Sequence, residues 1–435
     1  MKIQLINHAC LLIECNEVRI LTDPWIDGEI FDNGWSLVQD TKLPEPSEYD
    51  FVWISHEHPD HFRPNLFNGK KIPLDKVIII HERENDTKLK NFFMNRKYVV
   101  REIPDKGIEI NKVTICGGVS KSFDSWLSLS YNGETFLNLN DCILFSDITE
   151  LTNIKDRLGK ISSMAVQFSF ANWTGNKNDR SIRKKAKLRT FQSLEKIFDI
   201  LKPENIIPFA SFSYFSHEEN FYLNKNAIEI DELLEAFYNR NITVLKIGDT
   251  WESKNAKSSE IQTNSMKENA LAIKFWKEKY IEIQSRPLTK TKTKSMFALF
   301  RQFKIMKSYL EENNDLNTLS QKLEKYGKNQ SAIIYLSDHK KFIKYDIFSN
   351  ISLVDSDYYD VKMSSESLFN LMKNKWGFGT LMINGKFQAN YDTFSKFTIQ
   401  TRLYYMNNIG KFFPKNITVS DIKDSNSLVS NLLED

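Results

Sequence analysis

The sequence Ser55-His56-Glu57-His58-Pro59-Asp60-His61 follows a continuous apolar run at residues 50–55 and carries three imidazoles and a carboxylate within six residues. The 435-residue chain contains only seven histidines, and three of them at this spacing would occur by chance on the order of two times in a thousand. In a loop after a buried strand, His56 and His58 can face one side while Asp60 and His61 face a second site. Nitrogen and oxygen ligands paired in this way hold two metal ions side by side. We therefore expect these four residues to be ligands of a dinuclear metal centre.

The composition indicates a folded protein of more than one domain. A chain of 435 residues is too long for one ordinary domain, and 41% hydrophobic residues provide a sizeable core. The 59 basic and 56 acidic residues leave a net charge of +3, which gives no electrostatic reason to expect nucleic acid or a membrane as partner. The sequence has no apolar run of spanning length and no signal-peptide pattern, so we expect a cytoplasmic protein.

Short apolar runs dominate the first 250 residues and predict two sheets flanked by helices. Strands are expected at 3–6, 10–14, 18–22, 50–55, 76–80, 98–103, 112–115, 126–131, 135–139, 163–168, 206–209 and 242–247. An amphipathic helix is expected at 182–201. The polar stretch 253–267 is predicted to be a linker.

The remaining residues, 268–435, predict a smaller α+β C-terminal domain. Helices are expected at 268–284, 296–312, 364–373 and 391–407. Strands are expected at 332–336, 351–354 and 380–387. Residues 1–252 then form the domain that contains the metal centre.

The H-x-H-x-D-H pattern after an apolar strand resembles the metallo-β-lactamase superfamily, over roughly the first 250 residues. A closer resemblance is to the metallo-β-lactamase-like part of CMP-N-acetylneuraminate hydroxylases. It is carried by Asp23-Pro24-Trp25, by the histidine loop itself, and by Pro208-Phe209-Ala210 leading to Ser216-His217. The resemblance implies an α/β fold, the αββα sandwich, for residues 1–252. Those hydroxylases carry a Rieske domain, which we expect this chain to lack, because its four cysteines have no CxH spacing.

The resemblance also implies three further ligands. Asp141, after the apolar strand at 135–139, is the expected bridging carboxylate, and His217 is the expected distal ligand. The third histidine of the superfamily pattern is missing, and we expect Asp124 to replace it, with His81 as the alternative. One metal would then have His56, His58, Asp124 and the shared Asp141 as ligands. The other would have Asp60, His61, His217 and the shared Asp141.

Two further polar residues are candidates for the surroundings of the ligands. Asp23, at a strand end, can hold the far N–H of a ligating histidine. His8 can do the same, or it can contact the substrate as a catalytic residue. A buried polar residue of the core remains the other interpretation of His8.

Three hypotheses for the function follow from the expected ligands. Three carboxylates with four histidines form a harder donor set than a zinc pair prefers, which favours two iron ions, with zinc or manganese as alternatives. The first hypothesis is a diiron oxygenase or oxidase acting on a polar, nucleotide-linked small molecule, with electrons from an external donor. The second is a hydrolase of an ester, lactone, thioester or phosphodiester, in which Asp60 assists proton transfer. The third, a degenerate binding module, is disfavoured by the intact motif.

Overall fold

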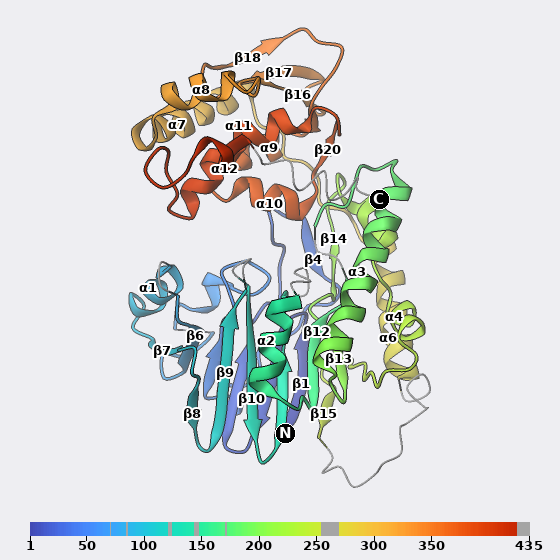
Figure 1. Ribbon diagram of the computed structural model, residues 1–435. Coiled ribbons are helices and arrows are strands. Elements are labelled where there is room, and N and C mark those ends of the chain that lie inside the picture. Colours follow the sequence, from blue (N-terminus) through green and yellow to red (C-terminus); the bar gives the residue numbers. More distant parts are fainter. Residues whose placement is uncertain are drawn as a thin grey trace.

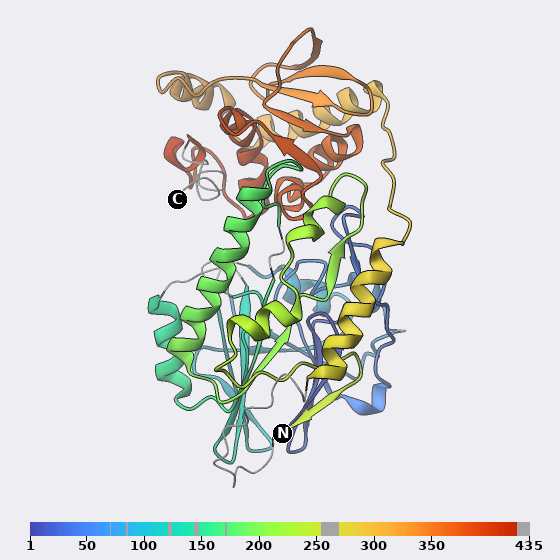
Figure 2. The same cartoon turned by 90° about the vertical axis from the view of Figure 1, so that its right-hand side faces the viewer.

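A computed structural model describes residues 1–69, 71–83, 86–120, 124–142, 148–169, 172–253 and 269–423. Figure 1 shows a two-sheet sandwich with a smaller helical and stranded unit above it, and Figure 2 shows the long helix α3 (Arg180–Leu201) running along the sandwich toward that unit. None of the described helices has both the length and the apolar character needed to span a bilayer.

The first sheet has seven strands in the order β15-β1-β2-β3-β5-β6-β7. Their bounds are β1 Lys2–Asn7, β2 Cys10–Cys15, β3 Val18–Thr22, β5 Phe51–Trp53, β6 Val77–His81, β7 Val99–Ile103 and β15 Thr250–Glu252. Strands β1, β2 and β3 form an antiparallel meander, whereas β3, β5, β6 and β7 are parallel. The carboxyl ends of the parallel strands therefore meet at one edge, where Asp23 and the histidine loop follow β3 and β5.

The second sheet has six strands in the order β13-β12-β11-β10-β9-β8. Their bounds are β8 Ile108–Ile110, β9 Val113–Val119, β10 Ser125–Tyr131, β11 Glu134–Asn138, β12 Ser163–Gln167 and β13 Ile206–Phe209. Strands β11, β12 and β13 are parallel. The residues after β11 and before β10 contain the predicted ligands Asp141 and Asp124.

Apolar side chains from the two sheets meet in the main core. Leu5, Leu11 and Ile13 of the first sheet belong to the same buried cluster as Leu127 and Phe136 of the second. The other face of the first sheet packs on α1 (Lys88–Met94), and α2 (Ile148–Leu158) lies with α3 outside the second sheet. This arrangement confirms the predicted αββα sandwich.

The upper unit in Figure 1 has its own sheet, with strand order β18-β17-β16-β19-β20, and its own buried cluster. Its strands are β16 Ala332–Leu336, β17 Lys341–Tyr345, β18 Ile351–Val354, β19 Val361–Met363 and β20 Phe387–Ala389. Its helices are α7 Met296–Asn313, α8 Leu316–Glu324, α9 Ser365–Lys373, α10 Gly377–Asn384, α11 Phe394–Asn408 and α12 Val419–Lys423. We call residues 287–423 the C-terminal unit.

The C-terminal unit is joined to the sandwich by a buried polar junction. Asn384, at the end of α10, donates a hydrogen bond from Nδ2 to the Phe31 carbonyl at 3.1 Å. The Asn220 side chain donates to the carbonyls of Gly34 and Asn384, at 2.9 and 2.7 Å. The Lys386 ammonium group donates to the Asp32 carbonyl at 2.9 Å. The short strands β4 (Trp35–Leu37) and β14 (Ser213–Phe215) pair beside this junction.

Two expected strands are wrong. Residues 380–387 form the end of α10 and its exit, because Gly385 ends the helix in the left-handed region at φ 62°. In the stretch 242–247 only Ile242 pairs, with Ile206. The Thr243 N–H still donates to the Ile206 carbonyl, but the Val244 N–H donates to the Asn269 side chain at the start of α6 (Ala270–Gln284).

Helix α6 also corrects the predicted start of the C-terminal domain at residue 268. Its Ala272, Trp276 and Ile283 belong to the core of the sandwich, and the Trp276 ring stacks on Phe212 with centroids 3.8 Å apart. The helix therefore packs with the first domain rather than with the second. The predicted linker lies outside the described residues, apart from Ser253.

Candidate metal centre

The histidine loop turns sharply after β5, so that its side chains converge above the strand ends. The N–H groups of His61 and Phe62 both donate to the His58 carbonyl, at 3.0 and 2.7 Å. At the start of the loop, the Ser55 N–H donates to Asp23 Oδ1 at 2.8 Å. The loop is therefore tied both to itself and to the end of the neighbouring strand β3.

The first group of candidate ligands consists of His56, His58 and Asp124. His56 Nε2 and His58 Nδ1 lie 2.8 Å apart, and Asp124 Oδ1 lies 3.5 Å from His56 Nε2. His56 and Asp124 are buried, whereas His58 is exposed. The structure thus brings together three residues predicted to hold one metal.

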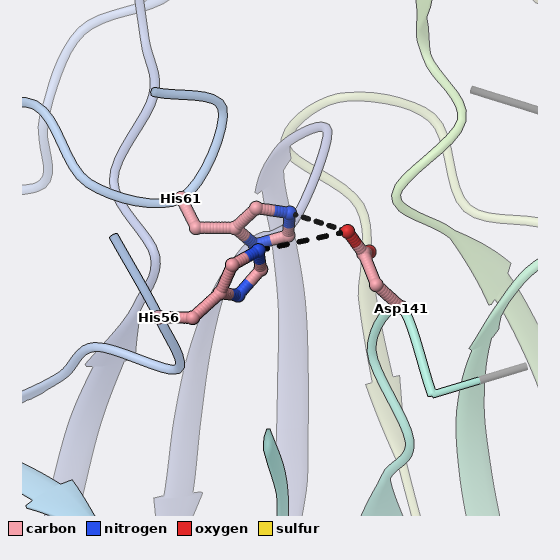
Figure 3. A group of neighbouring side chains, drawn as sticks. All are labelled: His56, His61 and Asp141. Carbon is pink, nitrogen blue, oxygen red and sulfur yellow. Dashed lines mark hydrogen bonds and ion pairs between the residues drawn. The ribbon is translucent and has the colours of Figure 1, made fainter. Parts of the chain in front are cut away.

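The second group consists of His56, His61 and Asp141 (Figure 3). Asp141 Oδ2 lies 3.0 Å from His61 Nε2 and 4.0 Å from His56 Nε2. His56 belongs to both groups, so the two sets of ligand atoms adjoin. Asp141 lies between two histidines that were assigned to different metals, which is the position that a bridging carboxylate would need.

Asp60 and His8 extend this arrangement on the side of His61. Asp60 Oδ2 lies 3.2 Å from His61 Nε2 and 3.8 Å from His8 Nε2. His8 is 1% exposed, and neither of its ring nitrogens has a hydrogen-bond partner among the described residues. A buried imidazole without partners faces Asp60, so His8 lies beside the candidate ligands as expected.

Asp23 fixes the orientation of two histidines at once. Its Oδ2 accepts hydrogen bonds from His61 Nδ1 at 3.0 Å, from the Ser55 hydroxyl at 2.7 Å and from Asn140 Nδ2 at 3.1 Å. Because the Ser55 hydroxyl donates its only hydrogen to Asp23, it must accept from His56 Nδ1, which lies 2.9 Å away. Both Nδ1 atoms therefore carry hydrogen, so the neutral forms of His56 and His61 have their lone pair on Nε2, where a metal would bind.

His81, the alternative to Asp124, lies in the interior of the sandwich. Its Nε2 accepts a hydrogen bond from Trp53 Nε1 at 3.2 Å, and it belongs to neither group of candidate ligands. Burial, followed by the positive charges of Arg83 and Arg157, lowers the pKa of His81 to about 3. These contacts favour Asp124 over His81, although the choice of ligand stays a prediction.

The structure does not bring His217 into either group of candidate ligands. Its Nδ1 accepts a hydrogen bond from the Glu219 N–H at 3.2 Å, and its backbone bridges to Thr289. The side chain is buried beside the junction, where burial and then Lys386 lower its pKa to about 4. His217 therefore stays a predicted ligand that the geometry does not favour.

Burial and neighbouring charges shift the pKa values of the candidate ligands in directions that favour binding of a cation. Burial lowers the pKa of His56 well below its ordinary value, and His61 and His58 lower it further, so this imidazole is neutral. Burial alone would raise the pKa of Asp60, yet His61 and His8 hold it well below its ordinary value. Burial opposes the cationic form of His61, but Asp141, Asp60 and Asp23 raise its pKa well above its ordinary value. Neighbouring carboxylates thus favour positive charge at this position.

The donor atoms fit a pair of divalent metal ions. Asp60 Oδ1 and Asp141 Oδ1 are buried and have no hydrogen-bond partner among the described residues. Buried carboxylate oxygens without partners are costly, and metal coordination would satisfy them. The residues that would hold the ions are His56, His58 and Asp124 on one side and His61, Asp60 and Asp141 on the other.

Comparison with known proteins agrees with this geometry. Residues 2–122, which include the histidine loop, match the family model described as "Beta-lactamase superfamily domain". The chain has the metallo-β-lactamase fold. This match and the candidate ligands support a metal-dependent enzyme with a dinuclear site.

One curated relative and two solved structures show how far this metallo-β-lactamase-fold protein resembles individual proteins. A cytidine monophosphate-N-acetylneuraminic acid hydroxylase of Asterias rubens is 24% identical over 267 residues, covering 56% of this chain and 39% of the relative. CmlA, a diiron beta-hydroxylase from Streptomyces venezuelae, is 13% identical with a TM-score of 0.37, covering 58% of this chain and 54% of that chain. An isothiocyanate hydrolase from Delia radicum gut bacteria is 14% identical with a TM-score of 0.41. The match covers 59% of this chain and 100% of that chain. The chain spans about two fifths of the length of the curated relatives it matches.

Sequence reasoning missed two residues that position the ligands. Ser55 relays the hydrogen bond from His56 to Asp23, and Asn140 donates to Asp23 from the end of β11. Both directly precede a predicted ligand at a strand end, which was the available signal. Their side chains carry no metal-binding pattern of their own, so only the folded structure shows their partners.

Proposed function

We propose that this chain is a dinuclear-metal oxygenase or oxidase, with iron as the preferred metal. The proposal depends on one observation, the number of carboxylates around the shared histidine. Asp124 and Asp141 approach His56, and Asp60 approaches His61. An oxygen-rich set of this kind suits iron or manganese better than a set of histidines alone would.

Residues around the ligands would keep the site in one protonation state. His61 Nδ1 donates to Asp23, so this proton stays on the far side of the ring. The Ser55 hydroxyl holds the Nδ1 proton of His56 in the same way. When bound, an iron pair supplies the redox capacity for oxygen activation, and we expect the electrons to come from an external donor.

The substrate class is proposed from the similarity to the hydroxylases. Curated relatives named for cytidine monophosphate-N-acetylneuraminic acid match just over half of this chain. A polar small molecule that carries a nucleotide is therefore our first candidate. Asp60 and His8, which adjoin at 3.8 Å, are the proposed catalytic residues beside the metal ligands.

A hydrolase is the second candidate, and the unpartnered Oδ1 of Asp60 favours it. This oxygen is buried and has no hydrogen-bond partner among the described residues. A carboxylate in that position can take a proton from a water molecule at the metal centre. Such an enzyme would need no electron donor and would act on an ester, lactone, thioester or phosphodiester.

Metal analysis tests the two candidates against each other. The protein is purified without oxygen, its metal content is measured by elemental analysis, and Mössbauer spectra are recorded. We expect about two spin-coupled iron ions per chain that react with oxygen. Two zinc ions, with hydrolysis of generic esters or phosphodiesters, would overturn the oxygenase proposal and establish the hydrolase.

A further inference from the structure

Helix α11 of the C-terminal unit presents two polar side chains that the metal centre does not use. Arg402 and Tyr405 are three residues apart and so lie on the same face of the helix. The Tyr405 ring packs against α10, where a Cβ built on Gly379 would lie 3.1 Å from Tyr405 Cε2. In Figure 1, α10 lies at the edge of the unit that faces the strand ends of the sandwich.

The phenol of Tyr405 on α11 is affected by charges at the candidate metal centre. Burial raises the pKa of Tyr405, Arg402 lowers it, and the charges of Glu57 and Asp124 raise it again. The charges of Glu57 in the histidine loop and of the candidate ligand Asp124 therefore reach the Tyr405 phenol, as the charge of Arg402 does. A second contact agrees, because Phe31, which is bonded to Asn384 at the end of α10, has its ring centroid 6.1 Å from that of His58.

The described residues leave the guanidinium of Arg402 without an ion pair and its buried Nε without an acceptor. Two other arginines differ in this respect, since the fully buried Arg183 donates to the Lys177 carbonyl at 3.1 Å and the partly buried Arg286 to the Val38 carbonyl at 2.7 Å. A buried N–H group without an acceptor is costly, and an anion bound at the guanidinium of this half-buried side chain would satisfy it.

The chemistry of the missing partner follows from the guanidinium itself. Its planar fork of N–H donors matches the two oxygens of a carboxylate or a phosphate. Such an anion, approaching Asp124 and Glu57, would be repelled by their charge, and Arg402 would offset that repulsion. We propose that Arg402, with Tyr405 beside it, binds the anionic group of the substrate that reacts at the metal centre. This inference rests on the proposed metal centre for its place, but not on whether the reaction is oxidative or hydrolytic.

Calorimetric titration of the metal-loaded protein tests the proposal. The anionic probes are inorganic phosphate, cytidine monophosphate and free N-acetylneuraminate, which separate a simple phosphate, a nucleotide phosphate and a carboxylate. Uncharged cytidine is the neutral probe. We expect at least one anion to bind the unmodified protein, and Arg402→Gln to weaken that binding at least ~10-fold while the weak binding of cytidine is unchanged.

Further variants separate recognition from folding. Arg402→Lys keeps the stem and the charge and should lose less affinity than Arg402→Gln, because lysine makes only a point contact. Arg301→Gln, at an exposed position on α7, is the matched control and should bind as the unmodified protein does. Metal content and thermal unfolding of each variant are measured beforehand, and if Arg402→Gln does not fold, the comparison is made with Arg402→Lys.

Two results would overturn the anion site. One is that none of the three anions binds the unmodified protein, and the other is that Arg402→Gln binds them as tightly as Arg301→Gln does. Neither result depends on turnover, so they are distinct from failure of the oxygenase proposal, which metal analysis and oxygen reactivity decide.

Discussion

Asp23 is the residue on which the orientation of the metal centre depends. It accepts from His61 directly and from His56 through Ser55, so one carboxylate controls a ligand in each group. Its own backbone has φ 36°, a conformation that L residues rarely adopt. Strained backbone at a strand end is typical of functional sites, where the surrounding contacts hold it in place.

We predict that Asp23→Ala weakens metal binding by about 10- to 100-fold, because both histidines lose the group that fixes their tautomer. Metal affinity is measured by competition with a chelator of known affinity. Asp50→Ala is the control, since Asp50 pairs with Arg19 just before β5 begins. Equal affinity of the two variants would show that Asp23 does not orient the ligands.

The choice between Asp124 and His81 is a second prediction at the residue scale. Asp124 Oδ1 is 3.5 Å from His56 Nε2, whereas His81 Nε2 is occupied by the Trp53 indole. Asp124→Ala should therefore empty at least one metal position, while His81→Ala should keep the metal and lose stability. Elemental analysis and urea unfolding of both variants decide this, and loss of metal in His81→Ala alone would reverse the assignment.

At the scale of elements, strand β9 shows how tightly the interior behind the metal centre is packed. A Cβ built on Gly117 would lie 1.9 Å from His81 Cε1 and 2.7 Å from the Trp126 carbonyl oxygen. A glycine is therefore required where β9 passes the side chain at the end of β6. The neighbouring Gly118 of β9 (Val113–Val119) has a different packing reason, since a Cβ built there would lie 2.8 Å from Trp126 Nε1.

We predict that Gly117→Ala destabilises the protein by about 1–3 kcal/mol, through overpacking against His81. Gly410→Ala is the matched control, because no atom lies within 4 Å of the built Cβ and its φ is 75°. The control should lose only about 1 kcal/mol of unfolding free energy, which is the cost of placing an L residue in the left-handed backbone conformation. The free energy of unfolding in urea is the measurement, and an equal loss in both variants would refute the packing argument.

Elements with a clear period could be predicted from the sequence, and elements that depend on distant partners could not. Most strands of the sandwich and α3 lie within a few residues of the expected positions, because apolar runs bounded by turns define them. The run Leu381–Ile383 is equally apolar but forms part of α10, since periodicity cannot distinguish a short buried strand from a helix. The strand predicted at 242–247 does not form, because the Val244 N–H and the Leu245 carbonyl bond to side chains at the start of α6 and within it. A local sequence pattern does not reveal such partners.

The same limit applies to the candidate site. The four candidate ligands of the histidine loop were predicted because histidines are rare and the loop is compact, whereas Asp124 and Asp141 were expected from the resemblance to the superfamily pattern. The placement of His217 at the junction depends on Lys386 and Glu219, and Lys386 is more than 160 residues further along the chain. Arg402 gave no signal at all, because a single arginine in a helix is ordinary in sequence, and only the folded structure shows that the described residues leave its Nε unbonded.

At the scale of the whole molecule, the junction decides whether the C-terminal unit stays placed against the sandwich. A Cβ built on Gly34 would lie 2.6 Å from Asn384 Cβ, so these two segments of the chain approach each other as closely as glycine permits. Asn220 is fully buried and donates to a carbonyl on each side, Gly34 and Asn384. If α11 supplies a substrate contact, the metal centre and the C-terminal unit must keep this relative position.

We therefore predict that Asn220→Ala loosens the junction without removing the metal. The Asn384 carbonyl would lose its donor and the His217 N–H its acceptor, at a cost of about 1–3 kcal/mol each, whereas the Gly34 carbonyl would keep the Ser216 N–H. Hydrogen exchange should accelerate in residues 31–35 and 381–386, and thermal unfolding should broaden or separate into two transitions as the units lose their coupling. Asn416→Ala is the control, because its bond to the Gly410 carbonyl is exposed. Unchanged hydrogen exchange at the junction, with a uniform fall in stability, would contradict this prediction. The two units would then unfold together because Trp173 packs into the core of the C-terminal unit.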